Sequence, residues 1–565
     1  MRKFLSKTTV LTIIALLSAA LISACDTGIG KPMTREKAVK ELDDLLTDVE
    51  WTQQFVQRRA NIQLTKTNLM STLPDISEYP LVATPVTGGA EQVEIFVSTE
   101  KSGEGDDGWM RDAAITFNQS RQRLSSGKIA QVSIRKIASG TGAQFIASSK
   151  YVPQAFSPSN HLWLKLIEGH GISTKAITER TVGNVAGVVM KKTVAKRLRE
   201  NYPELSVKNI IDAVVQGRLV MGYTNPYASS TGLNFLVSVL DAFVGDEGGD
   251  MLRSEVVSAF ESFQRGIPFV AMTTLQMRDS VSNNGALDAF VMEYQTFVRA
   301  KPSMTNEYEF IPFGIRHDNP LYAVGDVSEG QLEVLNKFSA YLQRPQSKAK
   351  IKQYGFDGLN DYKSAYDYPA GSDLIAAQKI WKDKKDAGRT VTAVFLADVS
   401  GSMSGQRIKA LRKALLSGSD FISTDNKIGL VTFSDVVNVS LPPQPFNLIH
   451  KSSFYAAVED LDAGGGTAMY NGILVSLSVL LDAIAADPST KPLLFVLTDG
   501  ETNRGFNFDD VDEMISALRI PVYSIAYAAQ IDELKNLSSL VEASTTKAEE
   551  GNVAYAIGSL LNAQM

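Results

Sequence analysis

Residues 392–404 read TAVFLADVSGSMS, and this stretch decides the fold of the last third of the chain. The apolar run that ends at Ala397 shows no alternation between polar and apolar positions. A continuous apolar strand is typical of a parallel sheet whose two faces are both covered by helices. We therefore predict a buried central strand that ends at Asp398.

Oxygen-bearing side chains follow this strand at every second position, namely Asp398, Ser400 and Ser402. Hard divalent cations prefer carboxylate, hydroxyl and water oxygens, so the pattern favours Mg²⁺, with Mn²⁺ or Ca²⁺ as alternatives, over zinc. Asp and Ser are also common in ordinary turns. Three such residues do not by themselves distinguish a metal site from a turn.

Two later segments supply further oxygen ligands: residues 464–467, GGGT, and the apolar strand 493–497, which runs into Thr498-Asp499. The ends of parallel strands converge on one edge of a sheet, where sites form. With all three segments, residues 391–565 resemble a von Willebrand factor A (VWA) domain with a metal-ion-dependent adhesion site.

That resemblance implies a Rossmann-like α/β domain with a central, mostly parallel sheet. It also implies the metal ligands Asp398, Ser400, Ser402, Thr467 and Asp499. The ion would keep a coordination position open for a carboxylate offered by a partner protein. The alternative is a VWA fold whose metal site is unused.

Residues 90–355 alternate between short apolar strands and helical segments, which predicts a second α/β region with parallel strands. The order of elements resembles the two-lobed periplasmic solute-binding protein fold of type II. The resemblance implies that this region binds an oxyanion or another small polar solute.

Loops rich in small polar residues precede several predicted helices of this region. Helix N-termini expose unpaired N–H groups, so these loops are candidates for binding an anionic or oxygen-rich ligand. Ordinary helix capping by Ser and Thr is the alternative. The candidate residues are Ser98, Thr99, Ser139, Gly140, Thr141, Ser157, Asn225, Ser229, Ser230 and Thr231.

The N-terminus has the pattern of a secretory signal: basic residues precede an apolar run over residues 10–24 that is too short to span a membrane. The run ends in Ile22-Ser23-Ala24-Cys25, which resembles the lipobox of bacterial lipoproteins. We expect residues 1–24 to be removed and Cys25 to carry lipid, although an uncleaved anchor is the alternative. The expected location is extracytoplasmic, on a bacterial membrane that the sequence does not identify.

Two further segments are predicted to connect these parts. Residues 25–89 would form the lipidated N-terminus, a spacer helix from Thr34 to about Leu64 and an extended proline-containing approach, and residues 356–390 a polar linker. Cys25 is the only cysteine, so no disulfide within the chain can contribute to stability.

The net charge of −6 makes nucleic acid an unexpected partner, and the four histidines are not spaced as metal ligands. We therefore expect a membrane-anchored binding or adhesion-type lipoprotein rather than an enzyme. It would bind a protein through its metal and a solute or second protein through its middle region. The alternative is a solute receptor of an ABC-type transporter with an accessory VWA domain.

Overall fold

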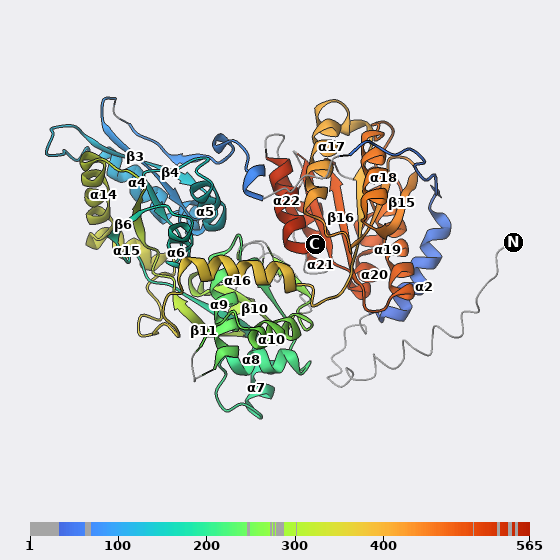
Figure 1. The fold of residues 1–565 in the computed structure, drawn as a ribbon, viewed down its shortest axis with the longest axis horizontal. Helices are drawn as coiled ribbons and strands as arrows, with labels where there is room; N and C mark the ends of the chain where they lie inside the picture. Colours follow the sequence, from blue (N-terminus) through green and yellow to red (C-terminus); the bar gives the residue numbers. More distant parts are fainter. Residues whose placement is uncertain are drawn as a thin grey trace.

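The computed structural model describes residues 33–565 apart from 63–68, 87, 246–248, most of 272–286, 301, 501, 528–530, 541–544 and 549–551. The predicted signal sequence and Cys25 lie outside the described residues. Figure 1 shows a C-terminal α/β body beside two smaller α/β lobes.

The C-terminal body is built on a sheet with the order β1-β15-β14-β13-β16-β17-β18. The predicted central strand is confirmed, because all residues of β13 (Val391–Asp398) are buried. It pairs in parallel with β14 (Lys427–Phe433) and β16 (Lys491–Thr498). The sheet continues in parallel through β17 (Val522–Tyr527) to β18 (Thr545–Ala548), whereas β15 (Val437–Pro445) runs antiparallel to β14.

Helices cover both faces of this sheet, as the apolar strand predicts. One face packs against α17 (Gln406–Gly418), α18 (Leu448–Glu459) and α22 (Val553–Gln564). The other packs against α2 (Arg35–Leu45), α19 (Met469–Ala486), α20 (Asp512–Leu518) and α21 (Ile531–Leu540).

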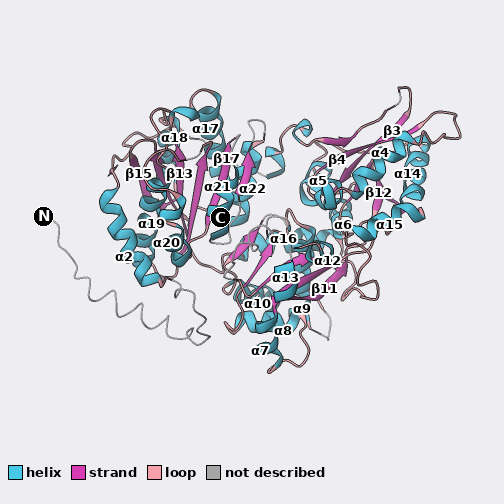
Figure 2. Cartoon of the chain, turned by 180° about the vertical axis from the view of Figure 1, so that it is seen from behind, coloured by secondary structure: helices cyan, strands magenta, loops and turns pink. Residues whose placement is uncertain are grey.

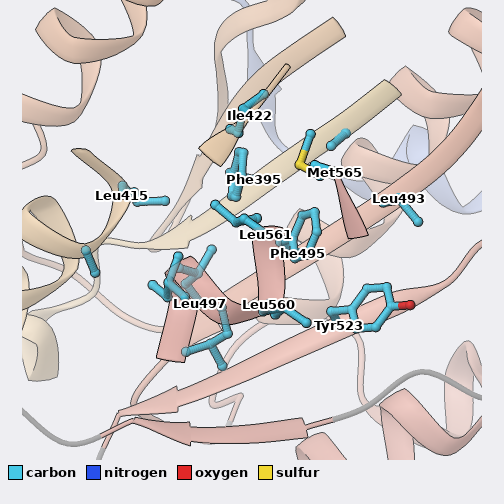
Figure 3. Close-up of a cluster of buried hydrophobic side chains, with 14 of the residues drawn as sticks. Phe395, Leu415, Ile422, Leu493, Phe495, Leu497, Tyr523, Leu560, Leu561 and Met565 are labelled. Carbon is cyan, nitrogen blue, oxygen red and sulfur yellow. The ribbon is translucent and has the colours of Figure 1, made fainter. Parts of the chain in front are cut away.

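Aromatic rings from three neighbouring strands stack under α22 (Figure 3). The ring centroids of Phe395 and Phe495 are 5.1 Å apart, and those of Phe495 and Tyr523 are 5.5 Å apart. Leu560 and Leu561 of α22 are fully buried in the same cluster. This cluster fixes the C-terminal helix against the strands that carry the predicted metal ligands.

Helix α19 is long and apolar enough to cross a membrane, the single such helix among the described residues. More than half of its apolar window is buried, and it packs against β13, β14, β15 and β16. We therefore assign α19 to the core of the C-terminal body.

The predicted spacer helix is shorter than expected and is not a free spacer. Thr34 is its N-cap, as predicted, but α2 ends at Leu45. Its apolar face, with Ala38 and Leu42 buried, packs against α20, and β1 (Trp51–Thr52) then pairs with β15. Figure 1 shows α2 along the outer side of the C-terminal body.

The region between consists of two lobes, each with its own sheet. The first sheet has the order β2 (Leu81–Ala83), β4 (Ala130–Lys136), β3 (Glu91–Val97), β5 (Ala155–Ser157), β12 (Leu321–Val324), β6 (Thr174–Thr178). The second has the order β11 (Tyr308–Arg316), β7 (Val185–Lys191), β10 (Ala289–Glu293), β8 (Met221–Thr224), β9 (Phe269–Ala271).

The chain passes from the first lobe to the second between β6 and β7 and returns between β11 and β12. The central strands of each sheet are parallel, as predicted, but β2, β6, β7, β11 and β12 make antiparallel pairs. The sheets are therefore mixed rather than wholly parallel: β7 and β12, by which the chain enters one lobe from the other, run against their neighbours, and so does β2 at the edge of the first sheet.

The helices of the first lobe are α3 (Thr99–Ser102), α4 (Trp109–Gln119), α5 (Ser139–Ala147), α6 (Leu162–Gly169), α14 (Glu329–Leu342) and α15 (Pro345–Gln353). Those of the second lobe include α7 (Lys192–Arg199), α8 (Val207–Val215), α9 (Ser230–Val244), α10 (Ser254–Gln264), α12 (Tyr294–Val298) and α13 (Pro302–Glu307).

The predicted linker 356–390 contains a packed helix, α16 (Gly371–Lys384), which contacts α6 of one lobe and α9 of the other. Its residues Leu374, Ala377 and Trp381 are buried because their spacing places them on one helical face. The Trp381 indole N–H donates to the Tyr223 hydroxyl at 2.6 Å. The segment predicted as a polar linker therefore includes a helix that is packed against both lobes.

Helix α22 also contacts both lobes. The Tyr555 hydroxyl donates to Gln144 Oε1 of α5 at 2.9 Å, and Gln564 Nε2 donates to the carbonyl oxygen of Val270 at 2.8 Å. In Figure 2, α22 lies on the side of the C-terminal sheet that faces the lobes.

Candidate functional site

The predicted metal ligands meet at the carboxyl edge of the C-terminal sheet. Strands β13 and β16 are parallel neighbours in register from Val391 to Ala397, so Asp398, the last residue of β13, and Asp499, the residue after β16, lie at adjacent strand ends. The Thr498 hydroxyl donates to Asp398 Oδ2 across this edge. The sheet therefore joins two carboxylates that are far apart in the sequence.

The serines of the first loop connect the two carboxylates. The Ser400 backbone N–H donates to Asp398 Oδ1 at 2.8 Å, and the Ser402 hydroxyl donates to Asp499 Oδ1 at 2.8 Å. Because Ser402 donates to Asp499, Ser400 Oγ donates to Ser402 Oγ, 3.0 Å away. The Ser400 and Ser402 hydroxyls and the Asp499 carboxylate thus form a chain of oxygen atoms, and the Ser400 N–H links this chain to Asp398.

The glycine-rich loop before Thr467 packs directly on the first loop. The Gly401 N–H donates to the carbonyl oxygen of Gly465 at 3.0 Å, and the Gly464 N–H donates to that of Val399 at 2.8 Å. Gly465 has φ +84°, a conformation that side chains with a Cβ rarely adopt. This loop brings Thr467 to the edge of the sheet.

Thr467 is also attached to the third loop. Its backbone N–H donates to Asn503 Oδ1 at 2.9 Å, and its carbonyl oxygen accepts from the Thr502 hydroxyl at 3.0 Å. The structure thus brings together the three loops that carry Asp398, Ser400, Ser402, Thr467 and Asp499.

The site is buried and acidic. Asp398 is 0% exposed and Asp499 is 6% exposed. Burial raises the pKa of Asp398 above its ordinary value, and the charge of Asp499 acts in the same direction, although hydrogen bonds from Ser400 and Thr498 oppose it. A cation bound here would relieve this cost by compensating the two carboxylates.

A residue that the sequence analysis missed supplies positive charge in this structure. The Arg407 guanidinium, in the first turn of α17, donates to Asp499 Oδ2 and to the carbonyl oxygen of Ser402. Its side chain is 45% exposed, while that of Asp499 is fully buried. A positively charged side chain is unfavourable in the first turn of a helix, because the helix N-terminus carries a partial positive charge. The unusual position of Arg407 in that turn was the only sequence signal that it pairs with a carboxylate.

The donor set fits a small hard cation. Ligand oxygens at about 2.0–2.1 Å in octahedral geometry around Mg²⁺ lie about 3 Å from their neighbours. The oxygen separations of 3.0 Å and 2.8 Å through Ser402 match that spacing. In the described part of the chain no group of three or more His, Cys, Asp or Glu could hold a metal, so the hydroxyls would have to complete the coordination.

A second candidate site is a cavity lined by residues of both lobes. The first lobe contributes Thr99, Glu100, Ala138, Ser139 and Ser159, and the second contributes Ala228, Ser229, Ser230, Thr274, Glu293 and Thr296. Of the predicted ligand-binding residues, Thr99, Ser139, Ser229 and Ser230 line it.

The other predicted loop residues lie behind this lining. Thr231 contacts two lining residues, Glu293 and Thr274, through its hydroxyl. The remaining residues make structural contacts. The Ser157 hydroxyl accepts from the Lys101 ammonium, and the Thr141 hydroxyl accepts from the Tyr555 hydroxyl. Asn225 Oδ1 accepts from the Tyr227 backbone N–H, and Gly140 lies against the Tyr227 backbone. The buried Ser98 hydroxyl has no hydrogen-bond partner among the described residues. Neither carboxylate of the lining, Glu100 or Glu293, is among the residues predicted from the sequence.

Comparison with known proteins identifies the C-terminal part. Residues 393–559 match the family model described as "von Willebrand factor type A domain". These residues form a VWA domain, in agreement with the resemblance that the loop motifs indicated.

The curated relatives match less than a third of this chain. Inter-alpha-trypsin inhibitor heavy chain H1 of Mesocricetus auratus is 27% identical over 190 residues, which cover 30% of this chain and 20% of the relative. Heavy chain H3 of Mus musculus is 32% identical over 120 residues, or 20% of this chain and 13% of the relative. The chain thus spans a fifth or less of the length of these relatives.

Solved structures resemble both parts of the chain at low identity. A von Willebrand factor type A structure from Catenulispora acidiphila is 18% identical, with a TM-score of 0.29, over 31% of this chain and 42% of that one. The periplasmic binding protein P5PA is 9% identical, with a TM-score of 0.37, over 52% of this chain and 99% of that one. A mussel byssus matrix protein, described with a zinc-occupied metal-ion-dependent adhesion site (MIDAS) motif, is 18% identical, with a TM-score of 0.27. The match covers 31% of this chain and 47% of that one.

Proposed function

We propose that the protein is a membrane-anchored extracytoplasmic binding protein that engages a partner protein through a divalent cation held by its VWA domain. The observation that carries this proposal is the convergence of two buried carboxylates and the Ser400 and Ser402 hydroxyls at one edge of the sheet. Asp398, Ser400, Ser402, Thr467 and Asp499 would hold the ion.

The chemistry of the site supports binding rather than catalysis. A bound divalent cation would act as a Lewis acid that accepts a carboxylate oxygen from the partner. Asp398 and Asp499 would leave part of the ion's charge uncompensated, and neutral hydroxyls would complete its surroundings. Ser402 is the exposed member of the set and marks the side from which a partner carboxylate would approach.

Titration of Mg²⁺ and Mn²⁺ into a soluble chain that starts at residue 26 tests the metal site by calorimetry. Zn²⁺ is included because zinc occupies this motif in another protein. The wild type should bind with saturation, whereas Asp398→Ala and Ser402→Ala should lose or weaken binding. Asp425→Ala, at an exposed position outside the site, is the matched control.

Asp398 is buried, so its replacement could also reduce stability by leaving the Thr498 hydroxyl unpaired. Ser402 is exposed, so its variant separates loss of metal binding from loss of folding. If Ser402→Ala and Asp398→Ala both bind metal as the wild type does, the proposal is wrong. If the metal binds, pull-downs with and without chelator then test for a carboxylate-bearing partner.

The membrane anchor is the second part of the proposal. The pattern Ile22-Ser23-Ala24-Cys25 supports lipid attachment at Cys25 after removal of residues 1–24. Mass spectrometry of the membrane-extracted protein should find an acylated N-terminal cysteine. Cys25→Ser should release the protein from the membrane fraction, and a variant that stays membrane-bound would contradict this part.

The cavity between the lobes favours a further role, the binding of a small solute. Its lining comes from both lobes, so a ligand seated there would contact both at once. We propose that this region binds a polar solute, either for the protein's own use or for delivery to an ABC-type transporter. Saturable solute binding that is independent of the metal would support the transport-receptor alternative.

A further inference from the structure

The charges of the interlobe cavity differ from those expected for an oxyanion site. Glu100 from the first lobe and Glu293 from the second both line it, together with hydroxyl groups. No lysine, arginine or aromatic side chain is among the described residues of the lining. The state of the two carboxylates decides what such a cavity can bind.

Glu293 is 4% exposed and accepts hydrogen bonds from neutral donors. Asn184 Nδ2 donates to its Oε2 at 2.6 Å, and the Thr231 hydroxyl is 3.5 Å from its Oε1. The remaining contact, at 2.9 Å, joins Oε1 to Nδ1 of the fully buried His317. The protonation of His317 therefore determines whether Glu293 has a cationic partner.

His317 is neutral because its other ring nitrogen must accept. Its Nε2 lies 3.1 Å from Asn160 Nδ2 and 3.0 Å from Asn234 Nδ2. Backbone contacts fix the orientation of both amides: Asn160 Oδ1 accepts from the Leu162 N–H, and Asn234 Oδ1 accepts from the Ile315 N–H. Since both amide nitrogens donate to Nε2, the proton of His317 is on Nδ1 and is donated to Glu293.

Glu100 also lacks a cation in direct contact among the described residues. Its oxygens accept from the hydroxyls of Ser159 and Thr99. The neighbouring Lys101 is fully buried, but its ammonium donates to Ser157 O, Ser157 Oγ and Pro158 O at 2.8, 2.9 and 3.0 Å. Its three N–H groups are thus used by neutral oxygens of one loop.

We propose that the interlobe cavity binds a small organic molecule carrying a primary or secondary ammonium group, which donates N–H bonds to Glu100 and Glu293. This inference deepens the solute-binding part of the proposed function and rests on it. An anion would be repelled by Glu293, whose direct hydrogen-bond partners are all neutral. A ligand ammonium would place a positive charge in direct contact with both carboxylates, which the Lys101 ammonium does not do, and would contact both lobes.

The lining also selects among cations. Quaternary ammonium groups are recognised by aromatic faces, and the described lining has none. Carboxylates and hydroxyls instead need a ligand that can donate hydrogen bonds. Amino alcohols, diamines and amino sugars have the required groups.

Calorimetric titration of the soluble chain that starts at residue 26 tests this with ethanolamine, putrescine and glucosamine. Choline is the matched quaternary control for ethanolamine, and sulfate, phosphate and molybdate are the oxyanion controls. At least one amine should bind with saturation, while choline and the oxyanions should not. Saturable binding of an oxyanion, or no amine binding at millimolar concentration, would overturn the proposal.

Variants assign the binding to the cavity. Glu100→Gln and Glu293→Gln should each weaken amine binding by roughly tenfold or more, because a charge-assisted hydrogen bond is lost. Glu104→Gln, an exposed position a few residues from Glu100, should bind as the wild type does. Glu293 supports buried neighbours, so Glu100→Gln is the decisive variant if Glu293→Gln does not fold. Unchanged affinity in Glu100→Gln would overturn the proposal.

The same experiment separates this inference from the metal proposal. Asp398→Ala, which alters the VWA domain alone, should bind the amine with wild-type affinity. Loss of amine binding in this folded variant would contradict a site between the lobes. Metal binding without amine binding would overturn the amine inference and leave the VWA proposal standing.

Discussion

Arg407 should compete with the metal for Asp499, and its removal should tighten metal binding. Its guanidinium pairs with a carboxylate whose side chain is fully buried. A cation coordinated by Asp499 must displace that pairing or tolerate a positive charge beside it. Both effects weaken metal binding. Removal of the guanidinium in Arg407→Met should therefore tighten metal binding in either case.

The expected size of the change follows from the exposure of the pair. A hydrogen bond to a charged group contributes about 1.5–3 kcal/mol, but exposed ion pairs contribute less than about 1 kcal/mol. The Arg407 side chain is 45% exposed, so solvent screens its interaction with Asp499. We therefore take the interaction energy at the upper end of the range for exposed pairs, about 1 kcal/mol. The dissociation constant for Mg²⁺ or Mn²⁺ should therefore fall by about fivefold in Arg407→Met.

Arg504 provides a matched control for this measurement. Its side chain, next to Gly466 of the second loop, pairs with Asp435 at 2.7 Å instead of with a predicted metal ligand. Calorimetric titration of Arg407→Met and Arg504→Met compares two arginine losses near the same edge of the sheet. Metal binding that is unchanged or weaker in Arg407→Met would refute the reasoning. An equal gain in affinity in both variants would show that the loss of one positive charge, and not the contact with Asp499, causes the change.

Three further predictions concern stability and the contact between the domains. Burial alone would raise the pKa of Asp386, but Lys491 and Lys385, at 2.9 and 2.6 Å, outweigh it and hold that pKa below its ordinary value. Asp386→Asn should therefore destabilise the protein by about 3–5 kcal/mol in urea unfolding at neutral pH, because Lys385 stays buried. The wild-type advantage is present above the unfolded carboxyl pKa of about 4 and should shrink as the pH falls below it; a pH-independent difference would argue against the ion pair. Phe495→Ala should cost about 3–5 kcal/mol by leaving a cavity between Phe395 and Tyr523, and a loss below about 1 kcal/mol would show that the stack is not tightly packed. Tyr555→Phe should remove the hydrogen bond to Gln144 and increase amide exchange in α5, whereas unchanged exchange there would mean that α22 does not hold the first lobe.

Local patterns were sufficient to predict much of the VWA domain. The strand that ends at Asp398 is apolar throughout because both of its faces are covered, and that property is visible in a few consecutive residues. The ligand residues follow strand ends directly, so strand assignment also places them on one edge. The exact partners of those residues, such as Thr498 for Asp398, depend on the register of the sheet.

The N-terminal helix and the predicted linker show where local patterns were insufficient. The helical stripe with Ala38 and Leu42 predicts an apolar face but not the surface that covers it, and α20 is hundreds of residues away in the chain. Helix α16 was assigned to a linker because of its charged end, although Trp381 on the same helix is fully buried. Periodicity indicates that a face is apolar, while tertiary packing decides its partner.

The sequence by itself determined the C-terminal fold class, the order of the predicted metal ligands and the lipobox-like pattern at Cys25, because each is carried by a few neighbouring residues. Only the tertiary structure placed Arg407 on Asp499 and brought Glu100 and Glu293 to opposite sides of one cavity. An isolated Glu or Arg has no distinguishing pattern in the sequence. Its role depends on the charges and hydrogen-bond donors that the fold brings close to it, and these come from distant parts of the chain.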